Sequence, residues 1–135
     1  MTNDKEIQKT FQIGGDDQGI LYLEFLGNVE NVEDNIRQAE LIEQHIKKIF
    51  RDNPERKFNC LVDLTPVSKN THYPSPKARQ IYARMIDSKE FKKVSIVVPN
   101  SLSRAVMNFI VKTTKKQVRT KLFKNRKEAL DWINQ

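Results

Sequence analysis

The sequence predicts an α/β fold: a single domain with a mostly parallel five-stranded sheet, an antiparallel N-terminal strand and about four helices. Three observations predict this class. From residue 28 onward, amphipathic segments alternate with short apolar segments, which is typical of helices that connect parallel strands through right-handed crossovers. Near the N-terminus, two apolar segments flank a Gly/Asp-rich turn, which indicates a hairpin. A chain of 135 residues can bury one core of adequate size.

The hairpin consists of TFQI, the turn GGDDQG and the strand ILYLEFLG. Because side chains alternate between the two faces of a strand, each face of the second strand can be assessed separately. One face carries Ile20, Tyr22 and Glu24 and the other carries Leu21, Leu23 and Phe25, so both faces are mostly apolar. We therefore expect an interior strand that is covered on both sides.

Four segments predict helices. Residues 28–51 place apolar side chains at spacings of three and four, and an Asn-Pro pair follows them. A second helix begins with Ser75 as its N-cap and Pro76 at its first position, which suits the fixed backbone of proline. A third helix starts at Ser101. The fourth is capped by Asn125 and ends the chain.

Short apolar runs predict the remaining strands. Residues 58–64 and 94–99 are almost continuously apolar, as expected for strands buried on both faces. Residues 118–123 alternate only in part, so we place this strand near the sheet edge. The last helix carries the single tryptophan, Trp132, which we expect to cover one side of the sheet. The domain is expected to span residues 11–135, after a flexible N-terminus of residues 1–10.

Composition excludes several classes of protein. Charged residues make up 30% and hydrophobic residues 38%, as in a globular domain, and no apolar run approaches the roughly 20 residues that span a bilayer. The N-terminus lacks the apolar stretch of a signal peptide, so we expect a cytoplasmic protein. One cysteine excludes an internal disulfide. The net charge of +7 is uneven: residues 1–63 carry −5 and residues 64–135 carry +12.

In an open α/β sheet, ligands gather at the carboxyl ends of the strands. The residues expected at that edge are candidates for a binding or regulatory site: Asp63, His72, Tyr73, Ser75, Lys77, Arg79, Asn100 and Ser101. For Asp63, the simpler interpretation is that it caps the following loop through backbone N–H groups. Ser75 is either a plain N-cap or a serine whose phosphate the helix dipole would stabilise.

No arrangement of residues predicts catalysis, a metal or a cofactor. The two histidines and one cysteine are far apart in the sequence and have no metal-ligand spacing. Cys60 lies in an apolar strand and is expected to be an inert core thiol. The four glycines form no phosphate-binding motif. We therefore expect a protein that is not an enzyme.

The run KTTKKQVRTKLFKNRK contains eight basic residues among sixteen and one aromatic residue, Phe123. It crosses the end of one helix, a strand and the start of another helix, so its charges need not share a face. It also lacks the interleaved aromatic residues on which bases stack. Nucleic-acid binding is therefore the less favoured use of the basic half.

Several segments resemble, in order and spacing, the SpoIIAA-like branch of the STAS domain family, the fold of bacterial anti-sigma-factor antagonists. Residues 19–29 are similar to its opening strand and glycine, residues 60–67 to its central strand and aspartate, and residues 94–109 to its next strand and helix. Residues 122–133 are similar to its closing pattern, which is carried by Phe123, Glu128, Ala129, Trp132 and Ile133. The resemblance extends from about residue 11 to the end.

The resemblance implies an STAS-like fold without known catalytic residues. Roles in that family include partner-switching regulation, with a serine or threonine phosphorylated at the start of the second helix, and binding of small apolar or anionic ligands; related folds include lipid carriers. Ser75 falls near the regulatory position. However, the chain has PSPKAR after a longer loop, where regulators of that family carry D-S-S-G-L.

Three functional hypotheses follow. The first is a non-enzymatic binding or regulatory module that presents its loop edge and basic half to a protein partner with an acidic surface. The second is a carrier or sensor of a small apolar, lipid-like ligand, held in a cavity near Tyr73, Tyr82, Met85 and Phe109. The third is a nucleic-acid-binding protein, whose affinity would fall steeply with salt. A homodimer is compatible with each.

Overall fold

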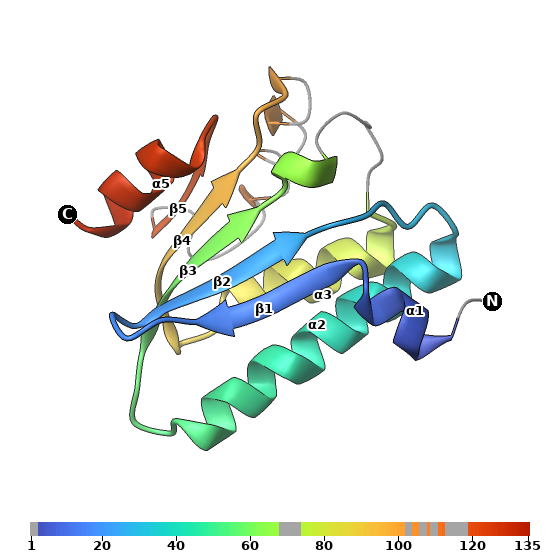
Figure 1. Ribbon diagram of the computed structural model, residues 1–135, viewed down its shortest axis with the longest axis horizontal. Helices are drawn as coiled ribbons and strands as arrows, with labels where there is room; N and C mark the ends of the chain where they lie inside the picture. Colours follow the sequence, from blue (N-terminus) through green and yellow to red (C-terminus); the bar gives the residue numbers. More distant parts are fainter. Residues whose placement is uncertain (1–2, 68–73, 102–103, 106–107, 109–110, 113–118) are drawn as a thin grey trace.

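The computed structural model describes residues 3–67, 74–101, 104–105, 108, 111–112 and 119–135 (Figure 1). The elements whose bounds lie within these residues are five strands, four α-helices and a short 3-10 helix, and they confirm the expected α/β class with one mixed sheet. The order of elements is α1 (Asp4–Gln8), β1 (Phe11–Gly15), β2 (Ile20–Phe25), α2 (Val32–Asp52), β3 (Phe58–Asp63), η1 (Thr65–Val67), α3 (Pro76–Ile86), β4 (Phe91–Val97), β5 (Thr120–Phe123) and α5 (Arg126–Ile133).

The five strands lie in the order β1-β2-β3-β4-β5. β1 pairs antiparallel with β2, and the other three pairs are parallel. The hairpin, the interior position of β2 and the edge position of β5 are thus confirmed. The turn of the hairpin needs Gly19, whose φ of +84° lies in the region that L side chains rarely adopt.

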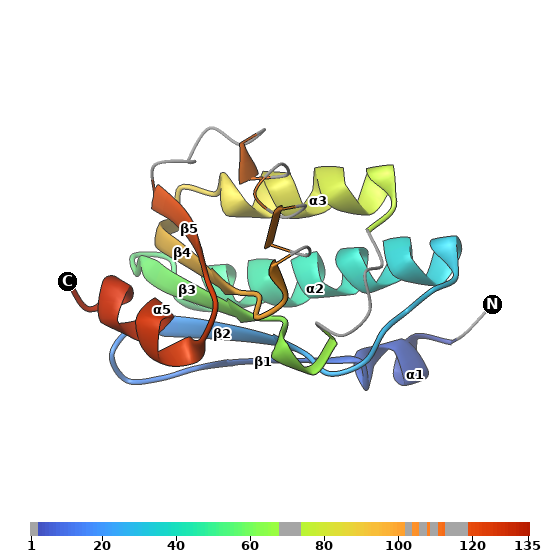
Figure 2. The ribbon, with the colours of Figure 1, turned by 90° about the horizontal axis from the view of Figure 1, so that it is seen from above.

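The helices lie in two layers, one on each face of the sheet (Figure 2). α2 and α3 cover one face side by side, and α5 covers the other. Successive right-handed crossovers that advance in one direction across a sheet place their helices on the same face. Since α5 follows the last strand and is not a crossover, it can cover the opposite face.

Each face has its own apolar cluster. The larger cluster fills the space between the sheet and helices α1, α2 and α3, and includes Leu21, Ile42, Cys60, Ile81 and Ile96. The smaller cluster lies under α5 and includes Ile20, Leu61, Val97, Ala129 and Ile133, with Trp132 and Phe123 packed against it. The indole of Trp132 and the ring of Phe123 have centroids 5.6 Å apart. The expectation that Trp132 covers one side of the sheet is confirmed.

Side-chain caps fix where the helices begin. The side chain of Ser75 accepts the N–H of Ala78, and that of Asn125 accepts the N–H of Glu128, so both expected caps are confirmed. α2 begins at Val32, a few residues later than expected, because Asn31 is its cap. Of the expected third helix, the described residues from Ser101 to Val111 are helical, and the rest lie outside the described part of the chain.

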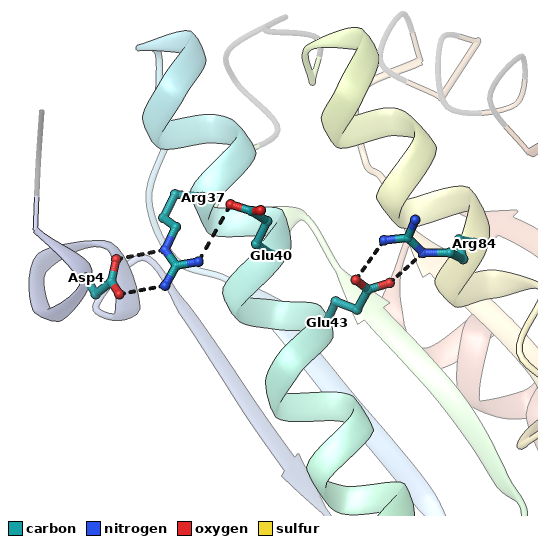
Figure 3. A network of polar contacts seen from close by, with 5 residues as sticks. All are labelled: Asp4, Arg37, Glu40, Glu43 and Arg84. Atoms are coloured by element: carbon teal, nitrogen blue, oxygen red, sulfur yellow. Dashed lines mark hydrogen bonds and ion pairs between the residues drawn. The ribbon is translucent and has the colours of Figure 1, made fainter.

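The N-terminal boundary of the domain differs from the expectation. Residues of the supposed flexible N-terminus form α1, whose Ile7 is 2% exposed and belongs to the larger apolar cluster. Asp4 also accepts hydrogen bonds from Nε and Nη2 of Arg37 on α2, at 3.0 and 2.8 Å (Figure 3). A helix of five residues with one apolar side chain has no periodicity, which explains why the sequence pattern did not reveal it.

Candidate functional site

The parallel strands end at one edge of the sheet, where α2 and α3 begin (Figure 1). In the register of the sheet, Glu24 at the end of β2 lies opposite Asp63 at the end of β3, and Asp63 lies opposite Val97 of β4. The start of α3 is joined to that of α2 because the N–H of Ser75 donates to Oδ1 of Asn35 at 2.9 Å. The carboxyl edge therefore combines strand ends with helix N-termini, as expected from the sequence.

Asp63 is buried at this edge and uses both carboxylate oxygens. Oδ1 accepts the backbone N–H of Thr65 at 2.9 Å, which confirms that Asp63 caps the loop after β3. Oδ2 accepts a hydrogen bond from Nη1 of Arg126 at 3.1 Å. Asp63 thus holds the η1 turn and the start of α5 in place, and the simpler of its two interpretations is the one the contacts support.

Arg126 is the centre of a group of residues of which the sequence analysis named only Asp63 as a candidate. Its Nη1 lies 3.5 Å from Oε1 of Glu24, and its guanidinium lies over the ring of Tyr22, 5.1 Å from the centroid. The hydroxyl of Tyr22 donates to Oδ2 of Asp16 at 3.1 Å. We call this group the acid–arginine cluster; it consists of Asp16, Tyr22, Glu24, Asp63 and Arg126.

The contacts of this cluster shift two of its pKa values. The pKa of Asp16 lies below its ordinary value because the carboxylate accepts backbone N–H groups, that of Ile20 above all, and the Tyr22 hydroxyl. The pKa of Tyr22 lies above its ordinary value, mainly because the phenol is partly buried and also because it donates to Asp16. Each acid in the cluster is satisfied by a hydrogen bond or an ion pair, which suits a structural role better than acid–base catalysis.

Alternate residues of β2 suggest how part of the cluster could have been found. Tyr22 and Glu24 share a strand face, and Glu24 stands at the same edge as Asp63, so a polar group there was foreseeable. The arginine was not, because Arg126 is 63 residues away from Asp63 in the sequence. Only the position of α5 over the second face brings it to these acids.

The start of α3 presents the other predicted residues. Ser75 is partly buried, and its Oγ accepts the N–H of Ala78 at 3.3 Å, as a plain N-cap does. Lys77 is exposed and Arg79 is partly exposed, and neither forms an ion pair with another residue of the described ranges. The first turn of α3 contains no acid, whereas the first turn of α2 contains two, Glu33 and Asp34.

The remaining candidates of the loop edge either follow the end of β4 or lie outside the described residues. The carbonyl of Asn100 accepts the N–H of Arg104, whose guanidinium Nη1 donates to the carbonyls of Val98 and Pro99, each at 3.0 Å. Ser101 is exposed next to Asn100. His72 and Tyr73 lie outside the described residues.

Tyr82 and Met85 of the candidate apolar cavity lie on the buried face of α3. Met85 belongs to the larger apolar cluster, and the ring of Tyr82 packs edge-on against Phe25, with centroids 6.0 Å apart. The Tyr82 hydroxyl is buried without a hydrogen-bond partner among the described residues, and burial raises its pKa. Tyr73 and Phe109, the other residues expected near this cavity, lie outside the described residues.

Other groups offer little for chemistry. Complete burial raises the pKa of the Cys60 thiol to about 12, so it is not a nucleophile near neutral pH. In the described ranges, no group of three or more His, Cys, Asp and Glu side chains could hold a metal ion. Three basic residues of the C-terminal run make internal contacts in the described structure. Lys121 lies over the Trp132 ring at 5.5 Å, Lys124 Nζ lies 3.9 Å from Oε1 of Glu128, and Arg126 bonds Asp63.

Comparison with known proteins identifies a family whose function is unknown. The model of the family described as Domain of unknown function (DUF7793) matches residues 16–135, and the chain therefore belongs to this family. Comparisons with curated proteins and with solved structures give no match. None of the helices that the structure describes is long and apolar enough to span a membrane.

Proposed function

We propose that this protein is a non-enzymatic binding or regulatory module, which recognises a protein partner with an acidic surface through the carboxyl edge of its sheet. The observation that carries the proposal is the charge at the start of α3. Lys77 and Arg79 lie there without an acidic partner among the described residues, next to the positive end of the helix dipole. Cations at that end destabilise a helix, and such local conflicts are expected at functional sites.

The neighbouring contacts support a rigid recognition surface. Ser75 is held both by its own cap to Ala78 and by Asn35 of α2, and Asp63 is held by Thr65 and Arg126. A preorganised backbone reduces the conformational entropy that binding must overcome. The exposed cations then contribute long-range attraction for an acidic partner, which mainly raises the association rate.

The resemblance to the SpoIIAA-like branch of the STAS family is part of this proposal. In that family, partner-switching regulators are phosphorylated on a serine or threonine at the start of the second helix, and Ser75 falls near that position. The proposal therefore assigns the chain an STAS-like, bacterial and cytoplasmic role in regulation through protein binding. It predicts no turnover of a substrate, and it makes nucleic acid the less favoured partner.

A charge-reversal experiment tests the proposal. Tagged wild-type protein would be incubated with nuclease-treated lysate of its host, in parallel with Lys77→Glu/Arg79→Glu and with the matched control Lys89→Glu/Lys92→Glu. The control changes the same charge at exposed residues at the opposite end of β4. Glutamates in the first turn of α3 suit the helix dipole, so the edge variant is expected to fold.

The proposal predicts a stoichiometric partner that wild type and control retain and the edge variant loses. A partner that all three proteins retain equally would contradict the proposed surface. Absence of any protein partner would contradict the proposed function.

A second candidate function is favoured by one observation, the buried and unpartnered hydroxyl of Tyr82. A small apolar ligand with one hydrogen-bond acceptor would satisfy this donor, which otherwise lacks a partner in the described structure. Organic extraction of the purified protein followed by mass spectrometry would detect such a ligand. This candidate predicts a compound that copurifies with wild type and is depleted in Tyr82→Phe, and it is wrong if both extracts are empty.

A further inference from the structure

The two edge strands of the sheet differ in how their outer sides are protected. β5 contains Lys121 and is flanked by Arg119 and Lys124, so a second strand of the same kind would be repelled. Such charges are a common protection against pairing of edges. β1, with the sequence FQIGG, contains no charge and no proline, and it lies along the rim of the molecule (Figure 2).

The register of the hairpin shows which backbone groups of β1 point outward. The N–H of Leu26 donates to the carbonyl of Thr10, and the N–H of Asp16 donates to the carbonyl of Ile20, so even-numbered residues of β1 bond to β2. The N–H and C=O groups of Phe11, Ile13 and Gly15 therefore point away from the sheet. They form no hydrogen bond within the described part of the chain.

We propose that β1 pairs with β1 of a second copy of this chain, antiparallel and about a two-fold axis at Ile13, to form a continuous ten-stranded sheet across a homodimer. This inference is independent of the proposed binding function. The outward groups of Phe11, Ile13 and Gly15 are symmetric about Ile13, as a two-fold axis requires. Three residue pairs then exchange backbone hydrogen bonds: Phe11 with Gly15, Ile13 with Ile13, and Gly15 with Phe11.

The same register makes the flanking charges complementary. Antiparallel pairing about Ile13 joins strand residues whose numbers add to 26. It brings Lys9, the C-cap of α1 just before β1, next to the hairpin turn of the other copy, where Asp17 lies. Both residues are exposed, and neither forms an ion pair with another described residue. The two-fold axis generates this opposite-charge pair twice, once at each end of the joined strands.

Side chains near the axis also fit a second strand. On the sheet face that α2 covers, the Ile13 side chain is only partly buried, and in the dimer Ile13 of the second copy would cover it. On the other face, Gln12 lies opposite Gly14 of the second chain. The space over Gly14 is open, because a Cβ placed there would meet nothing within 4 Å. The partly exposed isoleucine and the open glycine thus favour close approach of the two strands.

A charge-swap series measured by analytical ultracentrifugation tests the register. Wild type, Lys9→Glu, Asp17→Lys, the double variant Lys9→Glu/Asp17→Lys and the control Lys92→Glu would be studied over a concentration series. Lys92 is exposed on β4, which β2 and β3 separate from β1, and its substitution changes the net charge as Lys9→Glu does. All substituted side chains are exposed, so every variant is expected to fold.

The proposal predicts a dimer in wild type and control. Each single swap creates two like-charge pairs and should raise the dimer dissociation constant about tenfold, and the double variant should restore it to within about threefold. A monomer at all concentrations overturns the proposal. A dimer that the single swaps leave unchanged, or that the double variant fails to restore, overturns it as well.

A spin-label measurement locates the interface independently of charge. A nitroxide on Gln12→Cys would lie near its symmetry mate, because diagonal neighbours across two strands have Cα atoms about 7–8 Å apart. Cys60 is buried and will not compete for the label. The proposal predicts strong dipolar broadening at position 12 and none at the control Lys92→Cys. Absence of broadening at position 12 in a sample that sediments as a dimer overturns it.

Discussion

Arg126, the first residue of α5, donates from Nη1 to Oδ2 of Asp63, the last residue of β3, at 3.1 Å. This contact joins the final helix to the central strand of the sheet. It also neutralises a carboxylate whose residue is only 8% exposed. The acid–arginine cluster therefore has a structural role. It fixes the start of α5 to the end of β3, at the carboxyl edge that we propose to bind a partner.

Removal of the arginine should leave Asp63 without a counter-charge. We expect Arg126→Met to lower the free energy of unfolding by about 1–2 kcal/mol, because a poorly solvated carboxylate loses a charged hydrogen bond while the partly exposed site admits some water. Urea denaturation of the variant measures this loss. Lys127→Met, at the exposed neighbouring position, is the matched control and should change stability by less than about 0.5 kcal/mol. Equal stability of both variants would contradict the structural role of Arg126.

Glu43 and Arg84 tie α2 to α3 through two hydrogen bonds, of 2.9 and 2.8 Å (Figure 3). The Arg84 guanidinium holds the pKa of Glu43 below its ordinary value of 4.5. A carboxyl group with a lowered pKa in the folded state contributes stability above its unfolded value, and this contribution is lost as the pH falls through the folded value. We therefore expect Glu43→Gln to be less stable than wild type at about pH 7.

The ion pair between Glu43 and Arg84 also makes the stability difference between wild type and Glu43→Gln depend on pH. Below the lowered pKa of Glu43, the wild-type carboxyl is protonated and the difference from Glu43→Gln should shrink toward zero. Urea unfolding of both proteins from about pH 7 to about pH 3 measures it. A difference that stays constant over that range would show that the ion pair is not its cause.

Trp132 closes the second face of the sheet, and two lysines contact its ring. Lys93 Nζ and Lys121 Nζ lie 5.0 and 5.5 Å from a ring centroid of the indole, and Lys93 also donates to the Trp132 carbonyl at 2.9 Å. We expect Trp132→Ala to lower the free energy of unfolding by about 2–3 kcal/mol, since a partly buried aromatic side chain and its cation–π contacts are lost. Asp131→Ala, at the exposed preceding residue, serves as the control in the same denaturation experiment. Equal stability of the two variants would contradict the packing of α5.

Cys60 allows a simple check on the core. The thiol is completely buried and its pKa is raised to about 12, so a thiol reagent such as Ellman's reagent should not react with the native protein near neutral pH. Full reaction is expected in denaturant. Rapid reaction of the native protein would show that β3 is more accessible than the structure indicates.

Local features of this fold were predictable from the sequence, and long-range ones were not. The caps at Ser75 and Asn125 depend on a residue and the N–H three positions on, so short patterns reveal them. The order of the five strands depends on pairing between distant segments, and no local pattern encodes it. The acid–arginine cluster was missed for the same reason, because it needs the last helix to reach strands that lie far earlier in the chain.

The candidate site shows the same division. The position of Asp63 at a strand end, and its role as a loop cap, followed from the residue type and its place after an apolar run. The absence of an acid from the first turn of α3 is also visible in the sequence, but its meaning needs the structure. In the structure, no described residue approaches Lys77 or Arg79 closely enough for an ion pair.

The most direct test of the proposed function is an NMR titration of the ¹⁵N-labelled protein with the partner that the affinity capture identifies. The proposed function predicts that chemical-shift changes concentrate at the carboxyl edge, at Asp63, Thr65 and the first turn of α3. It also predicts that the apparent affinity for the partner, measured from these changes, is at least about tenfold lower for Lys77→Glu/Arg79→Glu. Changes confined to the opposite end of the strands, around Lys89 and Lys92, would contradict it.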